Sequence, residues 1–331
     1  MGATPLFVIK YNNQILCQEK LGPANTMTIL IASSVVRGSH QGESHGGIYL
    51  IDVDKKQSAL AMDWNKSNID WQGRGWDRGL RGIAFDGDKI YIAASDELFV
   101  YTPEFEMIGS YRCPYLKHCH EISRFERRLY LTSTGYDSIL GFDLDSERFS
   151  WGMEVVLDDD EFRGRPFNPY SAGGPLPHNE LHLNNIFCTK NGMYISGLRT
   201  GATLLFNGTT LTEWGILPLG AHNARPYRDG VLFNDTVANL VRYITLDTQC
   251  AFKVPVYADE KLTHTDFDDS RIARQGFGRG LCIMDNGIIA AGSSPSTIAF
   301  HNIDKQKTIN AINLTYDIRN AIHGLEVWPY D

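Results

Sequence analysis

Histidine, arginine and asparagine residues recur at one fixed position ahead of several short apolar segments. Counting back nine residues from the first apolar residue of a segment gives a polar residue five times: Arg81 before Ile90, His120 before Leu129, Asn184 before Met193, His222 before Val231 and Arg279 before Ile288. A sixth residue of this kind, His323, lies in A-I-H-G-L-E-V-W-P-Y-D near the end of the sequence. We call these six the head residues.

The types of the head residues indicate a ligand site if the fold brings them together. The imidazoles of His120, His222 and His323 could bind a zinc or iron ion and leave one position open for water or substrate. They could also act as acid–base groups without a metal. Arg81 and Arg279 could hold an anionic substrate through bidentate hydrogen bonds.

Three further polar residues stand close to the heads in sequence. His182 precedes the Asn184 head by two residues, so we expect it on the same wall of the site. Three residues are candidate substrate contacts: His182, Asn184 and Arg225, the last of which lies in H-N-A-R-P. Glu121 directly follows His120 and could act as a general base if the local chain bends.

Each head is followed by the same order of elements: a strand, a tight turn, a second strand and a looser strand. Asn-Gly and Asp-Gly pairs at the turns suit two-residue hairpins. The repeat is about 40 residues long and helical periodicity is almost absent. This pattern is typical of a β-propeller, so we predict an all-β, six-bladed propeller that forms one domain over residues 1–331.

The predicted ring closes by sharing one blade between the two ends of the chain. The segment H-G-L-E-V-W-P-Y-D would supply the innermost strand of the N-terminal blade and so remove an open sheet edge. Two longer intervals between heads predict insertions, Phe149–Pro177 and Pro255–Phe277, that fold over one face. The predicted blades cover residues 27–76 with 322–331, 80–116, 118–160, 182–219, 221–256 and 278–318.

The innermost strands of a propeller line a central channel, where residues at one repeat position meet at the same height. The six heads would therefore form a ring in which histidines come from alternate blades and arginines flank His323. The alternative is structural, because a narrow polar channel can be filled with ordered water and perform no chemistry.

Composition and charge limit the range of partners. The formal net charge is −8, the sequence pI is about 5.7 and no lysine- or arginine-rich run occurs, which argues against nucleic acid and membranes as partners. No apolar run is long enough to span a bilayer. The six cysteines lack C-x-x-C spacing and the N-terminus lacks a signal pattern, which favours reduced thiols and a cytoplasmic location. A small, anionic molecule fits these properties as a partner.

Three blade starts in the C-terminal half have distinctive motifs: H-L-N-N at His182–Asn185, A-H-N-A-R at Ala221–Arg225 and G-F-G-R-G-L at Gly276–Leu281. They resemble the H-x-N-G, P-H-S-P-R and G-F-T-R-G-L segments that begin the blades of a family of poorly characterised bacterial β-propeller proteins. The resemblance implies the propeller fold and hardly constrains the reaction.

Two functions are compatible with these features. The first is a small-molecule enzyme of hydrolase, lyase or oxygenase type, with its site at the channel mouth and an anionic substrate held by the arginines. A divalent metal, zinc or iron, is the expected cofactor of its metal-dependent form. The alternative is a non-catalytic propeller scaffold that binds a ligand or a protein.

Overall fold

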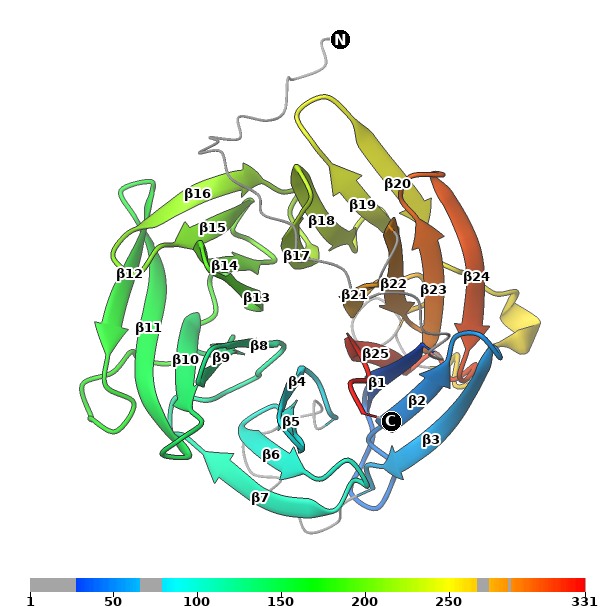
Figure 1. The fold of residues 1–331 in the computed structure, drawn as a ribbon, viewed down its shortest axis with the longest axis horizontal. Coiled ribbons are helices and arrows are strands. Elements are labelled where there is room, and N and C mark those ends of the chain that lie inside the picture. The colour runs from blue at the N-terminus through cyan, green and yellow to red at the C-terminus, as the bar shows by residue number, and fades with distance from the viewer. Residues whose placement is uncertain (1–27, 66–78, 267–273, 285–286, 331) are drawn as a thin grey trace.

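A computed structural model describes residues 28–65, 79–266, 274–284 and 287–330. Six antiparallel sheets follow one another around a common centre, each with one strand innermost (Figure 1). This arrangement confirms the predicted all-β, six-bladed propeller. Residues 66–76 of the predicted first blade lie outside the described residues.

The first three blades follow one another from the shared blade onward. The shared blade consists of β25 (Asn320–Val327), β1 (Ile29–Val36), β2 (Gly47–Asp52) and β3 (Gln57–Asp63). The second consists of β4 (Ile83–Asp86), β5 (Lys89–Ala94), β6 (Glu97–Tyr101) and β7 (Met107–Arg112). The third has five strands: β8 (Ile122–Phe125), β9 (Arg128–Ser133), β10 (Ser138–Asp143), β11 (Arg148–Asp158) and β12 (Glu161–Phe167).

The other three blades complete the ring with four strands each. The fourth consists of β13 (Leu183–Thr189), β14 (Gly192–Gly197), β15 (Ala202–Phe206) and β16 (Leu211–Ile216). The fifth consists of β17 (Ala221–Tyr227), β18 (Gly230–Asp235), β19 (Leu240–Ile244) and β20 (Gln249–Lys253). A 3-10 helix, η1 (Asp259–Lys261), precedes the sixth, which consists of β21 (Leu281–Ile283), β22 (Ile288–Ser293), β23 (Thr297–Asn302) and β24 (Lys307–Asn313).

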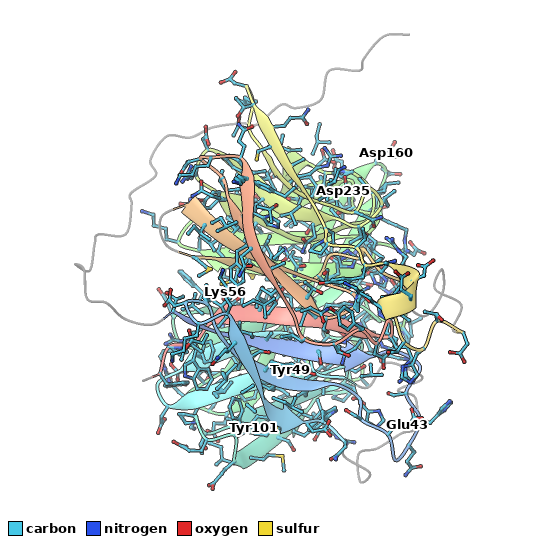
Figure 2. The ribbon with its side chains drawn as sticks, turned by 90° about the vertical axis from the view of Figure 1, so that its right-hand side faces the viewer. Glu43, Tyr49, Lys56, Tyr101, Asp160 and Asp235 are labelled. Atoms are coloured by element: carbon cyan, nitrogen blue, oxygen red, sulfur yellow. The ribbon has the colours of Figure 1, made fainter. Side chains whose placement is uncertain are left out.

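The ring closes through the blade that both ends of the chain share. Strand β25 pairs antiparallel with β1, from Leu30 opposite Val327 to Val36 opposite Asn320. Figure 2 shows this blade from the side, with β25, β1 and β2 next to one another. The predicted closure by the C-terminal strand is therefore confirmed.

The third blade extends beyond its predicted end at residue 160. Much of the expected insertion Phe149–Pro177 is strand, because β12 pairs with β11 from Asp158 back to Gly152. Asp159 and Asp160 form the turn between them with φ values of 50° and 62°. The four consecutive acidic residues Asp158–Glu161 thus form the tip of a hairpin that enlarges this blade.

Apolar side chains fill the spaces between neighbouring blades. Six buried clusters among the described residues each join two adjacent sheets, as Leu98 of β6 and Phe142 of β10 do between the second and third blades. Burial of each such side chain contributes about 1.5–3 kcal/mol. Because these clusters hold the blades together, the centre of the ring is available for polar side chains.

The cysteines and helices of the described residues bear on two sequence predictions. Five cysteines, Cys113, Cys119, Cys188, Cys250 and Cys282, are free thiols, and Cys17 lies outside the described part of the chain. Within that part, no helix has the length and apolar character needed to cross a membrane.

Candidate functional site

Five of the six head residues stand at or just before the start of the innermost strands, as the nine-residue spacing predicts. The neighbouring strand fixes their backbone: the amide of Arg81 donates to the carbonyl of Ala93 at 2.8 Å, and that of Arg279 to Gly292 at 2.9 Å. Asn184 and His222 are the second residues of β13 and β17, His120 precedes β8 by two residues, and His323 lies within β25 beside a register shift. Five of the six side chains are less than a tenth exposed: Arg81, His120, Asn184, His222 and His323.

A four-residue pattern governs where side chains point near each head. The residue two positions after the head packs into a different interblade cluster in every blade: Ile83, Ile122, Ile186, Ala224, Leu281 and Leu325. Register shifts beside Asn184 and between His222 and Arg225 show that the strands do not alternate regularly here. Such bulges re-aim side chains. The third residue after the head differs between blades: Ala84 and Cys282 pack into apolar clusters, whereas Arg225 interacts with Glu121 of the third blade.

Four head residues from four blades converge through ring contacts and one hydrogen bond. The ring centroids of His120 and His323 are 6.1 Å apart, and Nη1 of Arg279 donates to Nε2 of His323 at 2.9 Å. The ring of Phe277 lies between Arg279, whose Cζ is 4.7 Å from its centroid, and the imidazole of His222, at 5.6 Å. The structure therefore brings the predicted histidines and Arg279 into one group.

The two remaining candidates in this region have different surroundings. The His182 ring lies 5.4 Å from that of His120, as its position two residues before a head predicts. The Asn184 side chain instead links two blades, since its amide nitrogen donates to the carbonyl of Ala221 at 3.1 Å. His182 thus lies beside the histidine group, and Asn184 fastens the wall next to it.

Two arginines and an aromatic ring that the sequence analysis did not identify complete this group. The guanidinium carbons of Arg37 and Arg274 lie 5.1 and 4.7 Å from the centroid of Phe277. Arg274 and Phe277 belong to the Pro255–Phe277 insertion, which was expected to fold over one face but follows no repeat. We call Arg37, Arg81, Arg274, Arg279 and the three head histidines, together with Phe277, the cationic ring.

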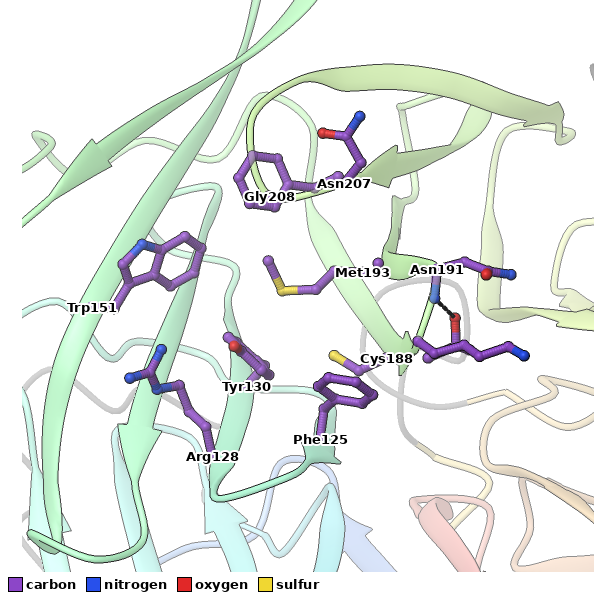
Figure 3. Close-up of a pocket in the computed structure, with 13 residues that line it drawn as sticks. Phe125, Arg128, Tyr130, Trp151, Cys188, Asn191, Met193, Asn207 and Gly208 are labelled. Atoms are coloured by element: carbon purple, nitrogen blue, oxygen red, sulfur yellow. Dashed lines mark hydrogen bonds between the residues drawn. The ribbon is translucent and has the colours of Figure 1, made fainter. Parts of the chain in front are cut away.

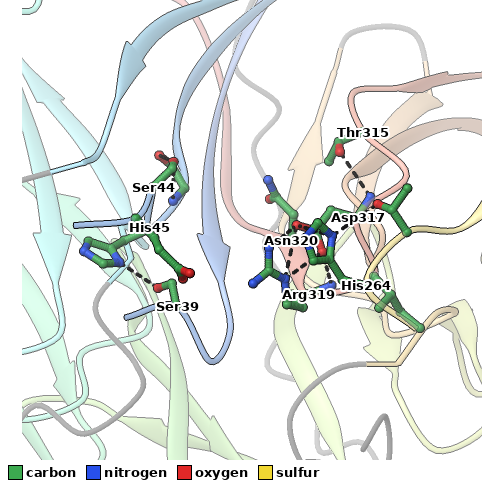
Figure 4. Close-up of polar contacts among 12 residues, drawn as sticks. Ser39, Ser44, His45, His264, Thr315, Asp317, Arg319 and Asn320 are labelled. Carbon is green, nitrogen blue, oxygen red and sulfur yellow. Dashed lines mark hydrogen bonds and ion pairs between the residues drawn. The ribbon is translucent and has the colours of Figure 1, made fainter. Parts of the chain in front are cut away.

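Ring closure positions Arg37. This residue directly follows β1, and its amide donates to the carbonyl of Arg319 at 3.0 Å. Figure 4 shows the flanking contacts: Arg319 Nη2 pairs with Asp317 at 2.8 Å on one side, and the hydroxyl of Ser39 lies 2.6 Å from Nδ1 of the buried His45 on the other. Two loops thus hold the segment that carries Arg37.

The arginines of the cationic ring repel one another. Burial, and then the charge of Arg37, lower the pKa of Arg81 to about 9, and burial with the charge of Arg274 lowers the pKa of Arg37 to about 10. Burial and the charges of these three residues lower the pKa of Arg279 well below its usual value. An anion placed among them would relieve this repulsion.

The head histidines are neutral, and their contacts fix where the proton lies. Burial, followed chiefly by arginine charges, lowers their pKa values well below 6.5: His120, His222 and His323. Because Arg279 can only donate, Nε2 of His323 accepts and its proton lies on Nδ1. Nδ1 of His222 faces the carbonyl oxygen of Gly220 at 3.1 Å, so it donates and Nε2 keeps its lone pair.

Several nitrogen atoms of the ring are left for a ligand. His120 is oriented like His222, with Nδ1 2.8 Å from the carbonyl oxygen of His118 and 2.9 Å from the hydroxyl of Thr134. Within the residues that the structure describes, three buried nitrogens of the ring have no hydrogen-bond partner: Arg37 Nη2, His222 Nε2 and Arg279 Nε. The ring therefore offers N–H donors to an anion, and the lone pair of His222 could accept a proton from that anion.

A metal ion fits this arrangement less well than an anion. The orientation of His120 and His222 suits metal binding through Nε2, but no group of three or more His, Cys, Asp or Glu residues in the described ranges could hold a metal ion. The neighbouring guanidinium groups would also repel a cation. The predicted zinc or iron site at His120, His222 and His323 gains no support from this geometry and stays a prediction.

Glu121 and Arg225 do not join the cationic ring. Oε2 of Glu121 accepts from the side-chain amide of Asn223 at 2.9 Å, and the guanidinium of Arg225 lies 5.0 Å from the centroid of Phe187. Arg225 occupies the third position after its head, and so does Glu326, which the sequence analysis missed. We call Glu121, Asn223, Arg225 and Glu326 the carboxyl cluster.

Two pockets away from the centre do not involve any predicted site residue. One of about 380 Å³ lies between the third and fourth blades, where Trp151, Tyr130 and Met193 face one another (Figure 3). Another of about 500 Å³ lies beside Glu154 and His178. The predicted site residues therefore do not line these outer pockets.

Comparisons with known proteins agree on the fold alone. No protein-family model and no curated protein matches the chain. A chain in the crystal structure of a nidogen/laminin complex has a TM-score of 0.56 at 9% identity, covering 91% of this chain and 98% of that one. A protein of unknown function from Bacteroides caccae has a TM-score of 0.54 at 10% identity, covering 92% and 100%. They support the propeller architecture that the blade-start resemblance implied, while the resemblance to that bacterial family itself stays a prediction.

Proposed function

We propose that the cationic ring binds a small anionic molecule and that its head histidines act on that molecule as acid–base groups. The observation that carries the proposal is the crowding of Arg37, Arg81, Arg274 and Arg279 around neutral imidazoles at the centre of a chain whose net charge is −8. Buried like charges are unfavourable unless a counter-charge is bound. A phosphate or carboxylate group would supply that charge.

The orientation of the histidines supports the chemical part of the proposal. The unprotonated Nε2 atoms of His120 and His222 can each accept a proton from a bound anion or from water. The anion also reduces the net positive field, so it raises the basicity of these imidazoles at the moment of binding. Arg279 and His323 form a pair that can orient the ligand.

Calorimetry with phosphate, sulfate and a series of small carboxylates tests the binding step. We expect at least one anion to bind the intact protein and to raise its unfolding midpoint, since a ligand at 100 times its Kd stabilises by about 2.7 kcal/mol. Arg279→Gln should lose this response. Arg148→Gln, which changes an exposed arginine at the start of β11, is the matched control. Equal binding by both variants would refute the anion site.

The catalytic step has its own test. Once an anion binds, esters and other derivatives of it are incubated with the protein and with His222→Asn, and turnover is followed by NMR. We expect the variant to retain binding but lose turnover, because it keeps a polar side chain and lacks a base. Binding without turnover by the unchanged protein would favour the alternative, a non-catalytic binding propeller.

Metal analysis separates the metal-dependent form of this proposal from the metal-free form. Stoichiometric zinc or iron in the purified protein, lost in His222→Ala, would support metal-dependent chemistry. Protein that turns over its substrate after treatment with a chelator would support acid–base catalysis by the histidines alone.

A further inference from the structure

The pocket between the third and fourth blades lies at the opposite end of the strands from the head residues. Arg128 begins β9 and pairs with Phe125 at the end of β8, and both residues line the pocket. The amide of His120, in contrast, donates to the hydroxyl of Thr132 near the other end of β9, at 3.0 Å. The pocket is therefore separate from the cationic ring.

Aromatic rings from both blades form one wall of the pocket. The Trp151 ring meets that of Tyr130 edge to face with centroids 6.0 Å apart, and it lies 6.2 Å from the Phe206 ring of the fourth blade. Tyr130 and Trp151 both pair with Gly141, one from each neighbouring strand. Because glycine adds no side chain there, the two rings meet above it. Figure 3 shows the thioether of Met193 facing these rings.

The pocket is positively charged. Its lining includes Arg128 and the exposed Lys190, and none of the thirteen described residues that line it is acidic. The nearest carboxylate oxygen paired with Arg128 is Oδ2 of Asp143, 3.8 Å from Nη2, which is too long for a hydrogen bond. No described residue forms a hydrogen bond with Arg128, and its Nε is buried without a partner. The guanidinium donors are therefore left for an anion.

The stem of Arg128 holds this charge beside the aromatic wall. A Cβ built on Gly141 would lie 3.1 Å from Cδ of Arg128 and 3.3 Å from Cβ of Trp151, so both side chains cross the space above this glycine. In Figure 3 the guanidinium group lies next to Tyr130 and Trp151 at the edge of the pocket. A flat ring and a negative charge would therefore find their partners side by side.

We propose that this pocket binds a small planar aromatic carboxylate. Its volume of about 380 Å³ lies in the range of small-molecule sites, roughly 300–1,000 Å³. The ring of the ligand would pack against Trp151 and the sulfur of Met193, and its carboxylate would accept charge-assisted hydrogen bonds from Arg128. The pocket shares no residue with the cationic ring, so this inference goes beyond the proposed function and does not rest on it.

Three probes of matched shape test the inference: naphthalene-2-carboxylate, its neutral carboxamide and the saturated decahydronaphthalene-2-carboxylate. Dissociation constants are measured on the intact protein by saturation-transfer NMR. We expect the aromatic carboxylate to bind about tenfold more tightly than the carboxamide, as expected for one charge-assisted hydrogen bond. The saturated acid should bind more weakly than the aromatic acid, because it has no flat face to pack against Trp151.

Variants assign the binding to this pocket. Arg128→Gln breaks no hydrogen bond to a described residue, so it should fold, keep the affinity for the carboxamide and lose the preference for the carboxylate. Arg163→Gln, at an exposed arginine of β12 in the same blade, is the matched control and should retain the preference. Trp151→Leu should weaken the binding of carboxylate and carboxamide alike, whereas Trp151→Phe, which keeps a ring, should restore most of it.

The outcomes separate this site from the cationic ring. Equal affinities for carboxylate and carboxamide, or a preference that survives in Arg128→Gln, would overturn the aromatic acid site. Binding that is lost in Arg279→Gln but kept in Arg128→Gln would place the probe in the cationic ring and also overturn it. The calorimetry with small anions is an independent measurement, so either proposal can fail without the other.

Discussion

The cationic ring and the carboxyl cluster both involve residues of the inner strands but differ in charge. In the fifth blade His222 belongs to the ring and Arg225 to the cluster, and in the shared blade the corresponding residues are His323 and Glu326. The ring gathers four arginines, whereas the cluster contains two carboxyl groups and one arginine. One structural frame therefore presents a steep change of charge over a few residues.

This comparison shows what the interblade clusters make possible. The residue that precedes Arg225 or Glu326 in sequence, Ala224 or Leu325, packs into the apolar core. Because stability comes from these clusters, the cationic ring can hold groups that are unfavourable when no ligand is bound.

We expect the largest loss of stability from adding a side chain at Gly324, which lies next to His323 in β25. The hydroxyl of Ser33 donates to the carbonyl of Arg81 at 2.5 Å and accepts from the Gly324 amide at 2.8 Å. A Cβ on Gly324 would overlap the Arg81 carbonyl and lie 2.7 Å from the Ser33 hydroxyl. Gly324→Ala should reduce the free energy of unfolding by about 3 kcal/mol in urea titrations. Gly173→Ala, where an added Cβ meets nothing within 4 Å, should change it little.

The next effect concerns charge in the cationic ring alone. Arg279→Gln should weaken anion binding by about 2 kcal/mol, or roughly thirtyfold, because it removes a charged donor. The ligand-free protein should not lose as much stability, since the substitution also relieves repulsion from Arg37 and Arg81. Calorimetry and urea unfolding measure the two quantities separately. A loss of stability as large as the loss of binding would show that Arg279 is chiefly structural.

The cationic ring and the carboxyl cluster should respond to pH with opposite sign. The folded-state pKa of Glu326, about 7, lies above its usual 4.5, so its contribution to stability falls as pH rises through this window. The head histidines have lowered pKa values, so their contribution falls as pH drops below 6.5. In Glu326→Gln, stability relative to the unchanged protein should increase by about 1 to 2 kcal/mol between about pH 5 and about pH 8. Parallel profiles would mean that this carboxyl is not perturbed.

The smallest expected effect concerns Asn184, which joins the fourth and fifth blades beside the cationic ring. Asn184→Ala removes the hydrogen bond to the Ala221 carbonyl and should cost about 1 kcal/mol of folding free energy. Anion affinity should change less than in Arg279→Gln, because Asn184 fastens two blades together. An affinity loss equal to that of Arg279→Gln would instead assign Asn184 to substrate binding, as the sequence predicts.

The sequence predicted the architecture because strand, turn and head repeat with constant spacing. Because that spacing gives each head the same position relative to the following strand, the sequence alone predicted that His120, His222 and Arg279 lie close together. Closure by β25 was predictable from the unmatched strands at the two ends of the sequence. The extra hairpin β11–β12 was not, since an acidic turn and a long insertion resemble a surface loop.

The residues that were missed lie where regular spacing fails. Alternation by two would place Leu325 rather than Glu326 on the inner wall, and the bulges reverse this. Comparing H-N-A-R and H-G-L-E would have shown an apolar third residue followed by a charged fourth, Arg225 or Glu326. Arg274 and Phe277 come from an insertion that has no counterpart in other blades, so no repeat could have located them.

Closure of the shared blade has a consequence for the order of assembly. The Ser33 hydroxyl and the Gly324 amide bond across 291 residues of chain. During synthesis β1 emerges long before β25, so a nascent chain with five finished blades still lacks His323 and Glu326, and the loop that anchors Arg37. Such a long-range contact forms late, and the proposed anion site is therefore complete only when the last strand docks.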